Sequence, residues 1–344
     1  MAPNELPVPS HFRPDKVDKV WKVPYQDRAL DSENWRRQYK IQPAYRDKFR
    51  IALLLVDVQN TFCIPEFELY VGGVSGTGAV DDNRRLCEFI YRNLNAITEI
   101  CPTMDTHQAV QIFHSIFLVN DKKEHPPPFT LVTPEDIENG IWRFNSELAS
   151  SLQIDAVYAR EYLHHYTQKL KQGGKYDLTI WPYHAMLGGI GHALVSAVEE
   201  AVFFHTLART SQPDFQIKGS NPFTENYSAL SPEVLAGPQT EKVAEKNFKL
   251  IQKLLNFDAV IIAGQAKSHC VAWTIEDLLN EICVGDEELT EKVYLLEDCA
   301  SPVVIPGVID YTVQANQAFK RFADAGMRVV RSTDPIANWP GMKR

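Results

Sequence analysis

The sequence predicts an α/β protein whose core is an open parallel sheet of about six strands with helices on both faces. Two observations carry this prediction. Short apolar runs bounded by polar residues recur along the chain, and segments with helical periodicity fall between several of them. The first run, residues 50–57, is apolar at nearly every position, which is typical of a central strand covered by helices on both sides.

The expected elements follow one another as strands and helices. The apolar runs predict strands at 50–57, 97–104, 178–181, 214–217, 258–263, 293–296 and 327–330. Apolar residues at helical spacing predict helices around 86–94, 271–282 and 313–322. Ligands of such sheets bind beyond the C-terminal ends of the strands, so the residues just after each run are the candidates for a site.

Two segments interrupt this pattern. Residues 1–48 are polar and contain prolines at 3, 7, 9, 14, 24 and 43, so we expect an N-terminal extension that packs on the body or on an oligomer partner. Residues 120–177 contain His125-Pro126-Pro127-Pro128 and then helix-like stretches, which predicts an inserted helical segment. We therefore expect one domain over 49–344, with the insertion at about 120–177 packed against it.

Composition excludes several classes of partner. The 344 residues are 44% hydrophobic and 23% charged, as in ordinary globular proteins. The net charge of -9, without a long basic run, argues against nucleic acid and acidic membranes. There is neither an apolar stretch of membrane-spanning length nor a secretory signal, and the six cysteines are sparse, so we expect a cytoplasmic protein with reduced thiols.

Cys270 stands where a strand pattern passes into a helix pattern. The run 258–264 precedes it and the helical run 271–282 follows it. A thiol at a helix N-terminus meets unpaired N–H groups and the positive end of the helix dipole, which favour the nucleophilic thiolate. Alone, a cysteine in this place is more often a small buried apolar residue.

Chemically useful side chains follow five of the predicted strands. They are Asp57, Asp105 with His107, the run Trp181 to His184, Lys218, and Cys270. Because the C-terminal ends of parallel strands meet at one edge of the sheet, we expect these groups to lie close together.

Three motifs resemble those of the nicotinamidase/isochorismatase-like cysteine hydrolases. The motifs are Leu55-Val56-Asp57-Val58-Gln59-Asn60-Thr61-Phe62-Cys63, Ile217-Lys218-Gly219 with Asn226-Tyr227-Ser228-Ala229, and Gly264-Gln265-Ala266-Lys267-Ser268-His269-Cys270-Val271. The resemblance runs in order from about residue 50 to 335 and implies the isochorismatase-like, Rossmann-like three-layer fold. It also implies a catalytic triad of Asp57, Lys218 and Cys270.

The roles implied by the resemblance suit these residue types. Asp57 would take the thiol proton, pass it to departing ammonia and then activate water against the thioester. Lys218 would hold Asp57 and Cys270 in ionised forms. The amide N–H groups of Ala266 and Cys270 would bind the oxyanion, and the family places a cis peptide at Gln265–Ala266. A base role for His269 is not expected, because adjacent residues on a turn seldom point at each other.

A second group of residues resembles the metal site of the nicotinamidases. Asp105 and His107 are two residues apart on an extended segment, so they share one side of it, and His184 follows the run 178–181. One carboxylate and two imidazoles suit zinc, iron or manganese with positions left for water and substrate. His114 is a further candidate ligand. Phe62 and Trp181 match the aromatic positions that sandwich a flat ring in the metal-dependent members.

The resemblance implies a cysteine amidohydrolase that converts a small carboxamide, with nicotinamide as the leading substrate, to the acid and ammonia. Its partners would be that amide and further copies of the same chain. Some positions depart from the family pattern: Lys267-Ser268 stands for the common Thr-Asp, and Thr106 and Gln108 stand for Trp and Pro. The alternatives are a hydrolase of a carbamoyl or biuret-like amide and a non-catalytic ligand sensor.

Overall fold

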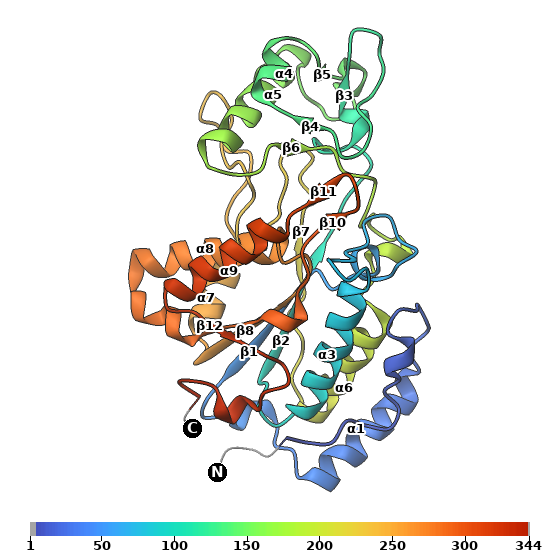
Figure 1. The fold of residues 1–344 in the computed structure, drawn as a ribbon, viewed down its shortest axis with the longest axis vertical. Helices are drawn as coiled ribbons and strands as arrows, with labels where there is room; N and C mark the ends of the chain where they lie inside the picture. Colours follow the sequence, from blue (N-terminus) through green and yellow to red (C-terminus); the bar gives the residue numbers. More distant parts are fainter. Residues whose placement is uncertain (1–4, 343–344) are drawn as a thin grey trace.

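A six-stranded parallel sheet forms the centre of the computed structural model, which describes residues 5–342 (Figure 1). The strand order is β12-β9-β8-β1-β2-β7, and every neighbouring pair is parallel. The bounds are β1 Ile51–Val56, β2 Glu99–Asp105, β7 Gln216–Lys218, β8 Ala259–Gly264, β9 Val293–Leu296 and β12 Arg328–Val330. The predicted sheet of about six strands is therefore confirmed.

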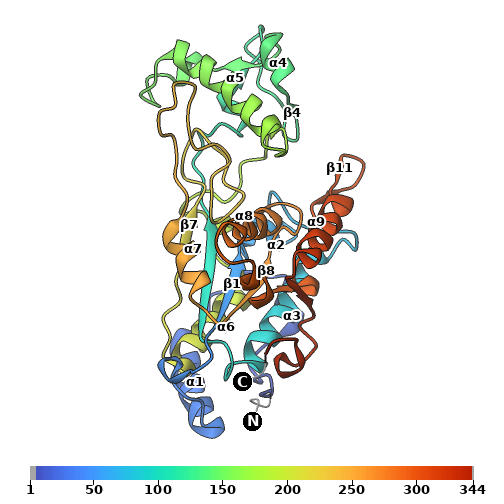
Figure 2. The ribbon, with the colours of Figure 1, turned by 90° about the vertical axis from the view of Figure 1, so that its left-hand side faces the viewer.

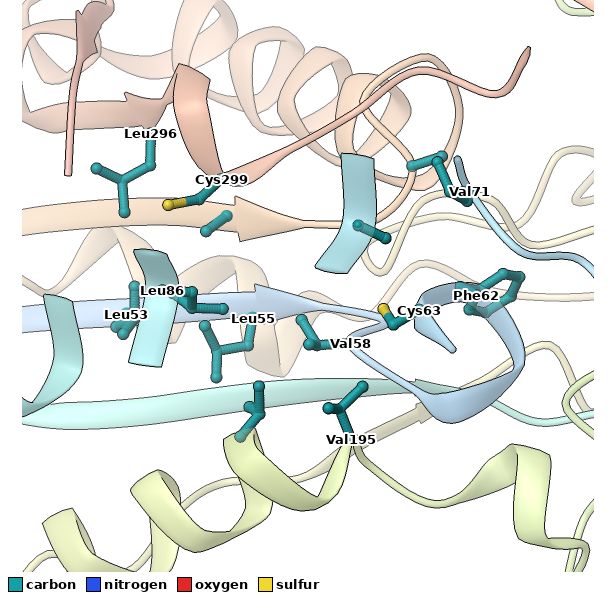
Figure 3. Close-up of a cluster of buried hydrophobic side chains, with 14 of the residues drawn as sticks. Leu53, Leu55, Val58, Phe62, Cys63, Val71, Leu86, Val195, Leu296 and Cys299 are labelled. Atoms are coloured by element: carbon teal, nitrogen blue, oxygen red, sulfur yellow. The ribbon is translucent and has the colours of Figure 1, made fainter. Parts of the chain in front are cut away.

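Helices cover both faces of this sheet. One face carries α3 (Gly78–Arg92) and α6 (Ser196–Arg209), and the other carries α7 (Phe248–Leu255), α8 (Cys270–Gly285) and α9 (Thr312–Asp324). Alternate residues of β1 enter two separate cores: Leu53 and Leu55 pack with α3 and α6, whereas Leu54 packs with α7, α8 and α9. Figure 3 shows the first of these cores around Leu53, Leu55 and Leu86. This burial on both faces explains the continuous apolar run.

One predicted strand lies outside the main sheet. The run 178–181 supplies β6 (Leu178–Thr179), which pairs antiparallel with β4 (Leu131–Val132) in a small sheet of the insertion. The position beside β2 is taken by β7 instead. An apolar run shows that a segment is buried but not which strand it pairs with, and the prediction of a third main-sheet strand was wrong for that reason.

The insertion lies beyond the C-terminal edge of the sheet (Figures 1 and 2). It contains α4 (Pro134–Glu138), α5 (Ala156–Gln172) and, besides β4 and β6, the antiparallel pair β3 (Leu118–Val119) and β5 (Arg143–Phe144). The segment predicted at about 120–177 thus also holds β4 and β5, whose partner strands β6 and β3 lie just outside those bounds. In both views α5 lies next to the long segment that follows β7.

The N-terminal arm packs on the body of the same chain. Its helix α1 (Tyr25–Tyr39) lies along α6 (Figure 1), where the Arg28 guanidinium meets Glu200 at 2.7 Å and the Trp21 amide donates to Ser196 Oγ at 2.9 Å. The remaining elements are α2 (Asn60–Cys63), the hairpin of β10 (Val304–Ile305) and β11 (Ile309–Asp310), and short 3-10 turns. None of the helices within residues 5–342 is long and apolar enough to cross a membrane.

Candidate active site

The turn between β8 and α8 places Cys270 at the C-terminal edge of the sheet. Gly264 has a φ of +125°, and a Cβ there would lie 2.0 Å from the Val56 carbonyl oxygen, so only glycine allows the end of β8 to lie this close to β1. The peptide bond Gln265–Ala266 is cis, as the family resemblance implies. The helix then begins at Cys270, and Asp57 directly follows β1, the strand that pairs with β8.

Lys218 joins the two carboxylates and the thiol of the site. Its Nζ lies 2.9 Å from Asp57 Oδ2, 2.8 Å from Asp105 Oδ1 and 3.7 Å from Cys270 Sγ, and it donates to the Asn226 carbonyl oxygen at 2.8 Å. All of these side chains except that of Asn226 are buried. The structure therefore brings the three predicted catalytic residues together, with Asp57 and Cys270 both beside the ammonium group of Lys218.

Burial opposes ionisation of the Cys270 thiol. It raises the pKa of Cys270 above its ordinary value, whereas the positive charge of Lys218 lowers it. Burial likewise raises the pKa of Asp57, although the positive charge of Lys218 opposes the shift. Burial and the positive charge of Lys218 therefore act in opposite directions on the thiol, and the thiolate form of Cys270 stays a prediction.

The turn between β8 and α8, residues 264–270, is hereafter the nucleophile turn. Two of its backbone amides are free to bind an oxyanion. Cys270 is the first residue of α8, so its N–H has no partner within the helix. Across residues 5–342 the N–H groups of Ala266 and Cys270 donate to no other protein atom. The Ala266 carbonyl, in contrast, accepts from the amides of His269 and Val271 and thereby closes the turn.

Asp105, His107 and His184 form a buried group whose ligand atoms lie within 4.8 Å of one another. The Nε2 atoms of His107 and His184 lie 2.7 Å and 3.7 Å from Asp105 Oδ2, which brackets the separation of about 3.3 Å between two ligands of a tetrahedral zinc ion. Lys218 binds the other carboxylate oxygen, Oδ1, and leaves Oδ2 directed at the two imidazoles.

Backbone carbonyls accept a hydrogen bond from the outer ring nitrogen of both histidines. Nδ1 of His107 donates to the Gly219 carbonyl at 3.1 Å, and Nδ1 of His184 donates to the Pro182 carbonyl at 2.7 Å. Burial and the nearby His107 lower the pKa of His184 to about 3, so its Nε2 keeps a lone pair. Backbone carbonyls on the outer nitrogens are the usual support of metal-binding histidines, and the donor set fits a divalent metal ion.

His114 lies near this group without joining it. Its ring centroid is 6.0 Å from that of His107 and 6.1 Å from that of His184, and it is not among the three residues whose ligand atoms converge. Its Nδ1 bonds the Ala109 carbonyl, while its buried Nε2 has no partner among the described residues. Burial lowers the pKa of His114 to about 4, so the ring is neutral.

A small, mostly apolar cavity of about 30 Å³ opens onto Cys270. Phe62 and Trp181, the two aromatic residues predicted to hold the substrate, both line it. The other lining residues are Leu69, Val71, Asp105, His184, Glu225, Tyr227, Ala266, His269, Cys270 and Val303. The nucleophile, the metal-ligand group and the aromatic walls therefore face one space.

Gln59 and Glu225 belong to the site although no role was predicted for them, and His269, for which no base role is expected, also lines the cavity. Gln59 clamps Asp105, because its side-chain amide donates to the Asp105 carbonyl and accepts the Asp105 N–H at 2.7 Å. Glu225 lines the cavity, and burial raises its pKa to about 8. His269 bonds Ser268 Oγ through Nδ1 and leaves its buried Nε2 without a partner in the described part of the chain. Gln59 stood within a quoted motif, but nothing local in the sequence distinguishes Glu225.

A second cluster of possible ligands, Glu99, Cys101 and Asp214, already has a cation. Lys253 Nζ lies 2.8 Å from Asp214 Oδ2 and also contacts Glu99. This cluster is an ion-pair network, so the candidate metal site is the one beside Cys270.

Comparison with known proteins identifies the fold. No family model and no curated protein sequence matches this chain. Among solved structures, yeast nicotinamidase bound to nicotinaldehyde superposes with a TM-score of 0.50 and 17% identity, covering 82% of this chain and 99% of the yeast chain. The chain has the nicotinamidase fold.

Two other similar structures come from bacteria and archaea. A nicotinamidase/pyrazinamidase of Acinetobacter baumannii gives a TM-score of 0.49 at 18% identity, covering 84% of this chain and 99% of its own. A pyrazinamidase of Pyrococcus horikoshii in complex with zinc gives 0.42 at 17% identity, covering 82% of this chain and 99% of its own. The superpositions cover almost all of each of these three known chains but leave part of the present chain without a counterpart.

Proposed function

We propose that this protein is a metal-dependent cysteine amidohydrolase that converts nicotinamide to nicotinate and ammonia. One observation carries the proposal: the ammonium of Lys218 joins Asp57, Cys270 and Asp105 in a single buried cluster beside the Asp105–His107–His184 group. The yeast protein of the same fold, described as a nicotinamidase, adds support from outside the chain.

The chemistry begins with proton transfer from the Cys270 thiol to the Asp57 carboxylate. As the S–H bond breaks, Sγ bonds the amide carbon, and the carbonyl oxygen becomes an oxyanion that the N–H groups of Ala266 and Cys270 stabilise. When the C–N bond breaks, the protonated Asp57 gives its proton to the leaving nitrogen, which departs as ammonia. This step leaves an acyl thioester on Cys270.

Hydrolysis of the thioester uses Asp57 a second time. Its carboxylate takes a proton from water as the oxygen bonds the acyl carbon, and the same two amides hold the second oxyanion. The C–S bond then breaks, and Sγ recovers the proton from Asp57 while the acid is released. The raised pKa of Asp57 suits a group that must both take and return a proton.

Lys218 lowers the cost of the charge that forms during these steps. Its Nζ is within 4 Å of both the base and the nucleophile, so it stabilises the thiolate and keeps Asp57 ionised for the first proton transfer. The carbonyl of Asn226 fixes the position of this ammonium group.

The metal ion would be held by Asp105, His107 and His184, a donor set typical of zinc, iron or manganese. When bound, it would supply a Lewis acid that can hold a ring nitrogen or water of the substrate complex. Phe62, Val71 and Trp181 give the cavity apolar walls, which suit the faces of a flat aromatic ring.

A panel of amides tests the substrate. The purified, metal-loaded protein should release ammonia from nicotinamide with a kcat/KM at least about tenfold higher than from biuret or N-carbamoyl compounds. A preference for biuret would replace nicotinamide by the alternative substrate class.

The nucleophile is tested with two cysteine variants. Cys270→Ala should abolish turnover, while Cys283→Ala, which removes an exposed cysteine of the same helix, should keep full activity. Absence of ammonia release from every amide, with metal bound and the Cys270 thiol titratable, would favour the non-catalytic alternative.

A further inference from the structure

The insertion carries a row of tyrosines along one face of α5. Tyr158, Tyr162 and Tyr166 are four residues apart, so they lie above one another on the helix. Successive ring centroids are 6.2 Å and 6.1 Å apart. This face is turned toward residues 219–247, the segment that leaves Lys218 and reaches up to α5, hereafter the lysine loop (Figure 2).

Two hydroxyl groups of the row bond the backbone of the lysine loop. Tyr162 Oη donates to the Phe223 carbonyl at 2.7 Å, and the amide of Glu225 donates to Tyr166 Oη at 3.0 Å. Tyr162 and Tyr166 are buried, with exposed fractions of 2% and 0%. Because loop backbone lacks the partners that a helix or sheet provides, these hydroxyls satisfy polar groups that would otherwise be buried without one.

The bonded stretch of the lysine loop leads directly into the site. Glu225 lines the cavity, the Asn226 carbonyl accepts from Lys218 Nζ at 2.8 Å, and Tyr227 Oη accepts from Trp181 Nε1 at 2.9 Å. The residue that Tyr166 holds is therefore the immediate neighbour of the residue that holds the ammonium of Lys218.

The end of the insertion contacts the nucleophile turn as well. Tyr176 Oη donates to the Ser268 carbonyl at 3.0 Å, and its ring packs on His269 at 4.8 Å. Lys175 Nζ lies 3.1 Å from the buried Glu233 carboxylate of the lysine loop and 3.9 Å from the centre of the Trp273 ring. The insertion thus ties the lysine loop to the start of α8.

We propose that Tyr166 and Tyr162 of the insertion are positioning residues, which hold the lysine loop so that Asn226 sets Lys218 between Asp57 and Cys270. Neither tyrosine lines the cavity, so neither contacts the substrate. The kinetic part of the test rests on the proposed amidohydrolase function, whereas the thiol part does not.

The experiment compares Tyr166→Phe and Tyr162→Phe with Tyr158→Phe as the matched control. Tyr158 belongs to the same row, but its hydroxyl contacts the side chain of Glu241, far along the loop from Asn226. We expect kcat for nicotinamide to fall about tenfold in Tyr166→Phe and severalfold in Tyr162→Phe, with KM within about twofold of the wild type, and no change in Tyr158→Phe.

A second readout is the rate at which iodoacetamide alkylates Cys270, measured in a Cys283→Ala background that removes the exposed thiol. Displacement of Lys218 lowers the thiolate fraction, so the alkylation rate of Tyr166→Phe should fall severalfold, with the thermal unfolding midpoint showing a folded protein. If nicotinamide is not a substrate at all, this rate still decides whether the tyrosines position Lys218.

Three outcomes would overturn the proposal. They are wild-type kcat and alkylation rate in Tyr166→Phe, a rise in KM alone, and equal losses in all three variants. The last result would mean that the row is needed only for packing. Should Tyr166→Phe fail to fold, Tyr162→Phe decides alone, because it removes a different hydrogen bond to the same loop.

Discussion

Removal of the Lys218 ammonium is the sharpest perturbation of the site. Lys218→Met keeps the length and apolar stem of the side chain but leaves the carboxylates of Asp57 and Asp105 without the cation that lies 2.9 Å and 2.8 Å from them. Both carboxylates are buried, so water cannot replace the lost partner. We expect the variant to be much less stable and catalytically inactive.

The size of the expected loss of stability follows from the two ion-pair distances. Each ion pair at these distances is worth about 6 kcal/mol at an effective dielectric constant of about 20, and the desolvation of Lys218 offsets much of this. The measured cost of breaking a buried pair by removing one partner is about 3–5 kcal/mol, which is the expected fall in the free energy of unfolding near neutral pH.

The free energy of unfolding of Lys218→Met should depend on pH in a definite direction. Without Lys218 the pKa of Asp57, already raised by burial, rises further, so the folded variant binds a proton that the unfolded chain releases. Because the folded variant binds this extra proton, its free energy of unfolding falls as the pH rises. The difference in free energy of unfolding between the wild type and Lys218→Met should grow by up to about 1.4 kcal/mol per pH unit. Lys218→Met/Asp57→Asn should recover about half of the stability but none of the activity.

Urea unfolding of metal-free protein at three pH values between 6 and 8 measures the stability, and ammonia release from the metal-loaded protein measures the activity. A Lys218→Met protein as stable as the wild type at every pH would refute the buried ion cluster. A double variant no more stable than the single one would show that Asp57 is not the group left without a partner.

Three further predictions concern His184 of the metal-ligand group, Gly219 beside Lys218, and the buried His205. His184→Ala should lose bound metal on dialysis, and unchanged metal content by elemental analysis would contradict the assigned ligand. Gly219→Ala should lower both metal affinity and activity, because its Cβ would lie 2.6 Å from Asp105 Oδ1 at a φ of +81°; an unaltered variant would show that the backbone can move away. Burial lowers the pKa of His205 to about 4, so the stability its neutral form provides is complete above pH 6.5 and falls by about 1.4 kcal/mol per pH unit toward pH 4. His205→Gln should unfold in urea with a weaker dependence on pH over that range, and an unchanged slope would contradict the assignment.

Much of the fold was predictable from local patterns. The continuous apolar run of 51–56 reports a strand buried on both faces, and the periodicity of 271–282 reports a helix with one buried face. The run 178–181 shows the limit of such patterns, because two residues of strand can pair with any neighbour that packing brings near.

The residues of the site also fall into two groups, those that local sequence patterns predict and those that only tertiary contacts place. Asp105 ends β2, and His107 lies two residues further on, in a bridge to Met186 beyond the strand, so the spacing predicted their shared side in an extended segment. Strand ends place Asp57, Asp105 and Lys218 at one edge of the sheet, whereas His184 follows β6, which lies outside that sheet. Glu225 carries no such local signal, since its place in the cavity depends on a loop held by α5. The tyrosines of the insertion became meaningful only when their hydroxyls were seen to bond that loop.

The amino-acid sequence by itself determined the layered sheet, the set of reactive residues and their order along the chain, because periodicity and spacing act over a few residues. Tertiary structure alone decided that Lys218 binds two carboxylates at once and that His114 stands apart from the metal group. It also set the depth of burial that opposes ionisation of Cys270, because this burial arises from segments far apart in the chain.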